Sequence, residues 1–235
     1  MKLKFSVCFL LLTLAIPSRA ADILSLLTNS PAAATNTTPA TNTVVEAPKV
    51  LAAVYTNSVG MLMLKVSDMA AGKYDVTQKE FQKIMGFNPS SFTGPTRPVD
   101  SVSWNDALAF CQKLTDADNK EMVIPAGYYY TLPTEDEWES LVGDASLDDS
   151  VTSANGDRDG TAPVGSMKPN SLGLCDMRGN VSQWTLGDDS KPYRVLRGGS
   201  WQDRIEINLR TAFRTYEPPD ATANTFGFRV VLKKK

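Results

Sequence analysis

The sequence contains no histidine among its 235 residues. This absence excludes an imidazole general base, a Ser-His-Asp triad, and zinc or iron sites that depend on histidine ligands. Cysteine is scarce as well, with three in the whole chain and none after Cys175. The composition therefore leaves few of the common hydrolytic and metal-dependent mechanisms open.

Excess charge of one sign is also missing. The formal net charge is -2, and the basic residues are scattered along the chain apart from the terminal Lys233 to Lys235, which we interpret as a solvated end. A nucleic-acid partner is not expected, because such proteins carry a clustered basic surface. Hydrophobic residues make up 42% of the chain, which is enough for a buried core.

The first twenty residues have the order of a secretory signal peptide. They contain a basic start (Lys2 and Lys4), an apolar run (Phe5 to Ile16) and small residues at the -3 and -1 positions (Ser18 and Ala20). The run is shorter than the roughly 20 residues that cross a bilayer. We therefore predict a signal peptide at residues 1–20, a secreted or periplasmic location, and no membrane span after cleavage.

Residues 21–50 are rich in Thr, Ala, Asn and Pro and have no stretch that could bury one face. Such a composition is typical of a disordered tether. Order is expected to begin near Leu51, so the predicted domain covers residues 51–235. Its two cysteines, Cys111 and Cys175, could form one disulfide in an oxidising compartment or be two separately buried thiols.

Three helices are predicted from their first turns. The capping pairs are Thr77 with Glu80, Ser103 with Asp106, and Thr134 with Glu137. The second helix carries apolar residues at intervals of three to four, including Trp104, Cys111 and Leu114. Beyond Gly143 the chain becomes loop-rich, with short strands predicted at 194–197 and 227–232. This order of elements indicates an α+β fold.

Six ordered motifs resemble those of the formylglycine-generating enzyme family, also called sulfatase-modifying factors. They are YDVTQKEFQKIMGFNPSSF (74–92), RPVDSVSWNDALAFCQKL (97–114), LPTEDEWE (132–139), GTAPVGSMKPNSLGLCDMRGNVSQW (160–184), RVLRGGSW (194–201) and GFRVVL (227–232). The resemblance covers about 51–232 and implies the loop-rich C-type-lectin-like fold of that family.

The resemblance also implies where catalysis would occur. Enzymes of the family convert a sulfatase cysteine to formylglycine with two Cu(I)-binding cysteines that follow the Gly-Gly-Ser motif. Counted forward from Ser200, these positions are Asp203 and Asn208, although counting back from RTAFR moves the second position toward Glu206. Carboxylate and amide oxygens do not select Cu(I) as thiolates do. Neither copper nor formylglycine-generating oxidase activity is therefore expected.

A second departure from the family pattern is Ser182 with Gln183, where the family has Trp-Glu, so we expect an altered floor below the cleft. An iron site built from carboxylates is a weaker alternative, suggested by Asp148 to Ser150 and by Asn155 to Gly160. Acidic loops of this kind are usually solvated turns.

Calcium is the better metal candidate, because it accepts carbonyl and amide oxygens. By resemblance, a calcium ion would be held by Asn170 together with Ser171, Gly173 and Cys175. The alternative is that Asn170 and Gly173 only build a turn.

The sequence favours a non-catalytic interaction module, with a divergent oxidoreductase of the same family as the alternative. The predicted cleft is formed by the segment from Ser200 to Asn208 and the loop around Asn224. Its candidate contact residues are Ser200, Trp201, Asp203, Asn208 and Asn224, and its ligand is expected to be a peptide, protein or glycan.

Overall fold

Three capping boxes set the helix starts in the computed structural model, which describes residues 51–150, 152, 159–188 and 190–235. The predicted signal peptide and tether lie outside these residues. The helices are α1 (Gln78–Met85), α2 (Trp104–Lys120) and α3 (Glu135–Val142). Each begins after the predicted cap, with the side chain of the third helical residue returning a hydrogen bond to the backbone of the cap residue.

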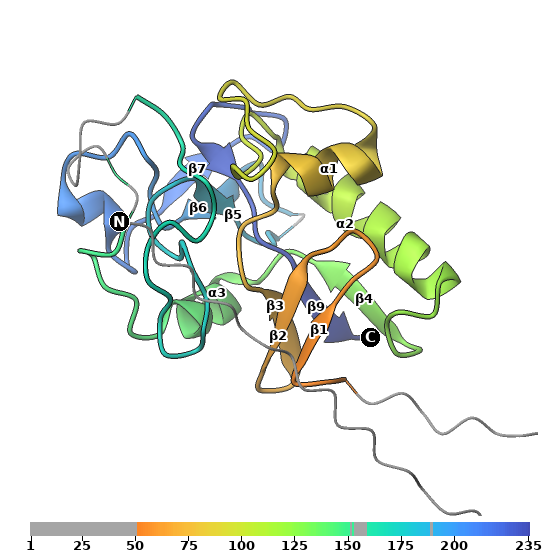
Figure 1. Cartoon of the computed structure of the whole chain (residues 1–235). Helices are drawn as coiled ribbons and strands as arrows, with labels where there is room; N and C mark the ends of the chain where they lie inside the picture. Colours follow the sequence, from red (N-terminus) through yellow and green to blue (C-terminus); the bar gives the residue numbers. More distant parts are fainter. Residues whose placement is uncertain (1–50, 151, 153–158, 189) are drawn as a thin grey trace, which may run out of the picture. The chain divides into compact units, whose positions relative to one another are not determined.

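The strands form two sheets (Figure 1). The five-stranded sheet has the order β1 (Val54–Thr56), β2 (Leu62–Val66), β3 (Met69–Gly72), β9 (Val231–Lys234) and β4 (Tyr128–Thr131). The four-stranded sheet has the order β7 (Thr215–Glu217), β6 (Arg194–Arg197), β5 (Ser182–Trp184) and β8 (Phe226–Gly227). All neighbours are antiparallel except β5 and β8. The predicted α+β class is confirmed.

The strand predicted at 227–232 is two strands. Gly227 pairs with Gln183 in the four-stranded sheet, whereas Val231 and Leu232 pair within the five-stranded sheet. Arg229 lies between them, and its buried guanidinium donates to the carbonyls of Gly72 at 2.6 Å and Cys175 at 2.5 Å. The chain thus changes sheets at this arginine, which the alternating pattern alone did not indicate.

The five-stranded sheet is covered on both faces, because alternate residues of a strand point to opposite sides. On β3, Ala70 packs in the cluster that contains Phe110 and Leu114 of α2. Ala71 packs in the cluster that contains Trp138 of α3. The two helices therefore enclose the sheet from opposite sides. Among the described residues, no helix has both the length and the apolar character needed to cross a membrane.

Cys111 and Cys175 are both free and buried. The structure thus corresponds to the second alternative for these residues, two separately buried thiols. Burial raises the pKa of both thiols, which keeps them protonated and poorly nucleophilic.

Arg197 is the last residue of β6, and it connects α3 to the loop that follows β6. Its side chain is fully buried and donates to Glu135 and Glu139, each at 2.6 Å. It also stacks 4.7 Å from the centre of the Trp138 ring and donates to the carbonyl of Thr211. One side chain thus fixes a helix, a strand end and the far end of a loop.

Replacing Arg197 with methionine tests this connection. The change keeps an unbranched side chain over Trp138 but removes the hydrogen bonds to both carboxylates and to Thr211. We expect the free energy of unfolding to fall by about 2 to 3 kcal/mol, measured by urea denaturation.

Arg214→Met is the matched control. Arg214 contacts the same two carboxylates at 2.5 and 3.2 Å, but its side chain is 32% exposed. The expected loss is about 0.5 kcal/mol, because exposed ion pairs contribute little. Equal losses in the two variants would show that Arg197 has no special structural role.

Candidate functional site

The loop from residue 198 to residue 211 begins with two glycines that no other residue could replace without strain. Gly198 has φ 91° and Gly199 has φ 69°. A Cβ on Gly198 would lie 2.9 Å from the carbonyl oxygen of Met177, and one on Gly199 would lie 2.7 Å from Leu209. The Gly-Gly pair therefore lets the chain turn closely against its neighbours before the site.

Two arginines hold the other end of this loop. Besides Arg197, Arg178 donates to the carbonyl of Leu209 and, at 2.8 Å, to the hydroxyl of Thr211. Its Nε donates to the carbonyl of Ala145 at 3.1 Å. Both ends of the loop are therefore fixed to the body of the domain.

Asp203 lies at the centre of the loop. One carboxylate oxygen accepts from the Ser200 backbone at 2.7 Å, and the other accepts from the Asn208 side-chain amide at 2.6 Å. Glu206 is exposed at the start of the short 3-10 helix η1 (Glu206–Leu209). The structure thus brings together Asp203 and Asn208, the pair obtained by counting forward from Ser200.

This pair supplies oxygen and nitrogen atoms where two sulfur ligands would be needed. A carboxylate and an amide are hard donors, and they are already hydrogen-bonded to each other. Cys111 packs in the core cluster that contains Phe110 and Leu114, and Cys175 is buried ahead of β5. The hydrogen bond between Asp203 and Asn208 holds the middle of the loop together, and the absence of copper stays a prediction.

Trp201 connects the loop to the other predicted wall of the cleft. Its indole N–H donates to the carbonyl of Asn224 at 3.1 Å. Its ring meets Phe92 edge to face, with 5.0 Å between ring centres. The five predicted cleft residues thus form two connected groups: Ser200, Asp203 and Asn208 in one, and Trp201 and Asn224 in the other.

Two exposed isoleucines on the same loop were not predicted as site residues. Ile205 is 60% exposed and Ile207 is 54% exposed. Apolar side chains at two nearby positions of a surface loop suit contact with another molecule better than contact with water. The sequence signal was the alternation RIEIN, which resembles a strand although the structure has a bend at Ile205 followed by the 3-10 helix η1.

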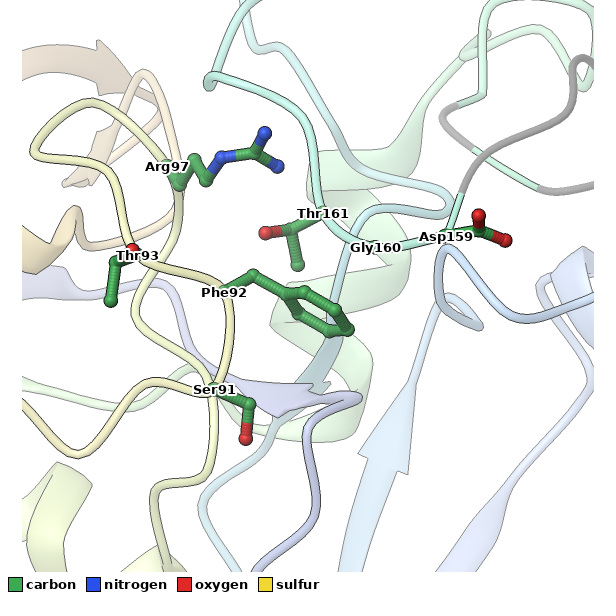
Figure 2. Close-up of a pocket in the computed structure, with 7 residues that line it drawn as sticks. All are labelled: Ser91, Phe92, Thr93, Arg97, Asp159, Gly160 and Thr161. Carbon is green, nitrogen blue, oxygen red and sulfur yellow. The ribbon is translucent and has the colours of Figure 1, made fainter.

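A pocket of about 510 Å³ was also missed by sequence reasoning (Figure 2). Its lining residues are Ser91, Phe92, Thr93, Arg97, Asp159, Gly160 and Thr161. They come from two segments separated by about sixty residues in the sequence, so no local motif could have indicated the pocket. Because Phe92 also contacts Trp201, the pocket adjoins the residues of the predicted cleft.

Gln183, one of the two residues that depart from the family's Trp-Glu pair, is a buried core residue. It is 1% exposed, accepts from the Trp138 indole at 2.9 Å and donates to the carbonyl of Asp176 at 2.8 Å. Its replacement of the family's glutamate therefore changes the hydrogen bonding of the core.

Three of the four residues expected to hold calcium, Asn170, Ser171 and Gly173, lie in a tight turn, and Cys175 follows it. Asn170 donates to the carbonyls of Leu141 and Val142 at 2.8 and 3.0 Å. Its side-chain oxygen accepts from the backbone of Leu172 and Leu174 at 3.1 and 3.0 Å.

The neighbouring groups are engaged in the same way. The Gly173 N–H donates to the Asn170 carbonyl at 2.9 Å, and Ser171 donates to Asp144 at 2.8 Å. The Cys175 carbonyl accepts from Arg229 at 2.5 Å, so a second cation at this oxygen would be repelled. These contacts are sufficient to build the turn without a cation. Calcium binding stays a prediction.

The carboxylate-only iron alternative finds no built site in the described part of the chain. Within that part, no group of three or more Asp, Glu or Cys side chains is arranged to hold a metal ion. Residues 153–158 of the second acidic loop lie outside the described residues, so that loop stays untested.

Comparison with known proteins places this geometry in a family. Residues 30–234 match the model of the sulfatase-modifying factor enzyme 1-like domain. The chain is 32% identical to chaperone protein LppX of Paenibacillus barcinonensis over 72% of this chain and 81% of that protein. It is 32% identical to the inactive C-alpha-formylglycine-generating enzyme 2 of Bos taurus, over 56% of this chain and 49% of that protein.

The fold has solved counterparts. Treponema denticola variable protein 1 superposes with a TM-score of 0.60 at 24% identity, covering 79% of this chain and 92% of that one. The predicted sulfatase-modifying-factor type of fold is confirmed by this likeness. The chain spans about half the length of the formylglycine-generating enzymes that it matches.

The turn at Asn170 yields a prediction. Asn170→Ala removes four hydrogen bonds and should lower the free energy of unfolding by about 2 kcal/mol, even with a chelator present. Urea denaturation in chelator measures this, with Asn105→Ala on the exposed side of α2 as the control. An undiminished stability in chelator would contradict the structural role of the turn.

Calcium is tested on the wild-type protein, because the variant is expected to be weakened by its lost turn. A calcium ion bound only to the native state at a hundredfold excess over Kd would add about 2.7 kcal/mol. Equal melting temperatures in calcium and in chelator would exclude a calcium site of this strength.

Proposed function

Because this chain belongs to the sulfatase-modifying factor enzyme 1-like domain family but has no cysteine after Cys175, we propose that it is a non-catalytic module. Its role is to bind a peptide segment of a protein partner. The binding surface is the loop 198–211, which includes Trp201, together with the adjoining pocket. Counted forward from Ser200, Asp203 and Asn208 stand at the two copper-ligand positions that the resemblance implies.

The hydrogen bond of 2.6 Å between Asn208 and Asp203 is the observation that carries the proposal. It occupies both side chains with each other, whereas a copper centre needs two thiolates free to bind the ion. The Gly-Gly turn fixes the start of the loop 198–211, and hydrogen bonds from Arg178 and Arg197 fix its end. A rigid loop without a reactive group is suited to recognition.

The surface chemistry supports binding to a protein. Ile205 and Ile207 are exposed on the same loop that carries the half-buried indole of Trp201. Apolar and aromatic side chains are enriched at the centres of protein interfaces. The names of two relatives also support a non-catalytic, protein-binding role. One is a chaperone protein, and the other is an inactive formylglycine-generating enzyme. A chaperone acts on polypeptides, which favours a peptide over a glycan as the ligand.

The proposal includes export from the cytoplasm. Residues 1–20 have the charge, apolar run and small-residue positions of a signal peptide, and residues 21–50 would tether the binding domain at a distance. Two buried thiols that stay protonated are compatible with an oxidising compartment, because they are shielded from oxidants.

The absence of copper chemistry is directly testable. The wild-type protein should show no tight Cu(I) binding in a competition titration, and it should not convert a Cys-x-Pro-x-Arg peptide to formylglycine, measured by mass spectrometry. Oxidation of the peptide in the presence of copper would overturn the proposal in favour of a divergent oxidoreductase.

The double variant Asp203→Cys with Asn208→Cys tests whether the metal frame persists. The two side chains meet in the wild type, so under reducing conditions two thiols at these positions should gain Cu(I) affinity by at least about tenfold over either single variant. The single variants are the matched controls, because one thiolate cannot supply a two-sulfur site. A double variant no better than its single counterparts would show that the loop does not preserve the ligand geometry.

A further inference from the structure

We propose that the pocket lined by Arg97 and Thr161 recognises a carboxylate group of the bound peptide, either an Asp or Glu side chain or a free C-terminus. This inference rests on the proposed function, and it specifies the chemistry of the ligand at one end of the binding surface. It is argued from the contacts of the pocket residues.

The wall of the pocket that carries Phe92 is rigid before any ligand arrives. Gln78, at the start of α1, donates to the Phe92 carbonyl at 2.6 Å and accepts from the Gly94 backbone at 2.9 Å. Buried Asp100 accepts from the Ser91 backbone at 2.7 Å. A loop held at these points keeps its side chains in place, which reduces the entropy lost on binding.

Arg97 supplies the positive charge. Its backbone N–H donates to the Gly94 carbonyl at 3.0 Å, and its side chain lies over Gly94, where an added Cβ would come within 3.0 Å of it. Among the described residues the Arg97 guanidinium has neither a hydrogen bond nor an ion pair. This differs from Arg178, Arg197 and Arg229, whose guanidinium groups are hydrogen-bonded inside the fold. A guanidinium presents paired N–H donors that match a carboxylate.

The hydroxyl of Thr161 is independent evidence that the pocket binds a ligand. Thr161 is 3% exposed, and its hydroxyl is buried without a hydrogen-bond partner. Buried polar atoms are rarely left in this state, so the group is suited to donate to a ligand. Figure 2 shows the Arg97 guanidinium reaching toward the segment of Gly160 and Thr161, with the Thr161 hydroxyl on the side of Arg97.

The rest of the pocket gives the ligand its direction. The Phe92 ring lies against Gly160, where an added Cβ would be 2.5 Å from the ring, and the same ring contacts Trp201. This apolar wall leads from the pocket to the loop 198–211. Asp159 lies at the end opposite Arg97, and its carboxylate points away from it (Figure 2). A ligand carboxylate is therefore attracted at the Arg97 end and repelled at the Asp159 end.

The experiment is a binding screen with an immobilised library of N-acetylated, C-amidated random heptapeptides. Peptides that bind the wild-type protein are remade with Glu or Asp changed to Gln or Asn. Peptides that bind through the carboxylate should lose affinity by about tenfold to a hundredfold, because the change removes a charge-assisted hydrogen bond. Peptides with a free C-terminus and no acidic side chain form the second arm, which identifies the other source of the carboxylate.

Variants assign the effect to the pocket. Arg97→Gln and the isosteric Thr161→Val should weaken acidic peptides and leave their Gln or Asn versions unchanged. Asp159→Asn should not weaken them, because it removes a repulsive charge. Lys113→Gln on the exposed side of α2 controls for the loss of one positive charge, and melting temperatures show that each variant is folded.

The outcomes separate the inference from the proposed function. Acid-dependent binding that is lost in Arg97→Gln supports both. Peptide binding that ignores acidic residues and is unchanged in Arg97→Gln overturns the carboxylate site and leaves the peptide-binding module standing. The protein is also tested against a panel of uronic-acid oligosaccharides. If it binds no peptide, the carboxylate site and the peptide-binding function are both overturned, whether or not it binds these sugars.

Discussion

The buried guanidinium of Arg197 is the constraint on which the site depends. It joins three parts of the chain that are distant in sequence: the carboxylates of α3, the end of β6 and the Thr211 carbonyl. The Gly-Gly turn directly follows Arg197, and the Arg197 side chain also holds Thr211. Both ends of the loop 198–211 are therefore fixed to this one residue. Arg178 adds a second attachment at Leu209 and Thr211. The guanidinium groups of Arg197 and Arg214 also lower the pKa of Glu139, which keeps that carboxylate charged as a partner.

This construction makes the shape of the loop independent of metal ligands, as the proposed function requires. The residues that shape the loop are the two glycines and the arginines at its ends, and none of them is a metal ligand. The two positions that would carry the copper ligands are held against each other by a hydrogen bond instead. In the proposed function, a carboxylate and an amide take the place of two thiols without removing the forces that hold the loop. The exposed isoleucines and the pocket beside Phe92 are the features proposed to recognise the ligand.

The sequence predicted the parts of this molecule that local chemistry determines. The caps at Thr77, Ser103 and Thr134 gave the helix starts, because a capping box is complete within four residues. The count forward from Ser200 named Asp203 and Asn208, which the structure joins by a hydrogen bond, but their equivalence to the copper-ligand positions stays a prediction.

Features made by residues far apart in sequence were not predictable in this way. The pocket joins Arg97 to Thr161, and the crossing between sheets at Arg229 depends on carbonyls of Gly72 and Cys175. The hydrogen bonds of Gln183 to Trp138 and to the carbonyl of Asp176 likewise join distant parts of the core, and the motif around residue 183 did not indicate them.

Site-specific photo-crosslinking in the producing organism tests the central claim most directly. A photoreactive side chain is placed at Ile205 in the loop 198–211, and the control is the same side chain at Met122, which is 74% exposed beyond the end of α2. The account predicts one discrete protein adduct from position 205 and none from position 122. No adduct at position 205, or the same adducts from both positions, would contradict a binding surface built on this loop.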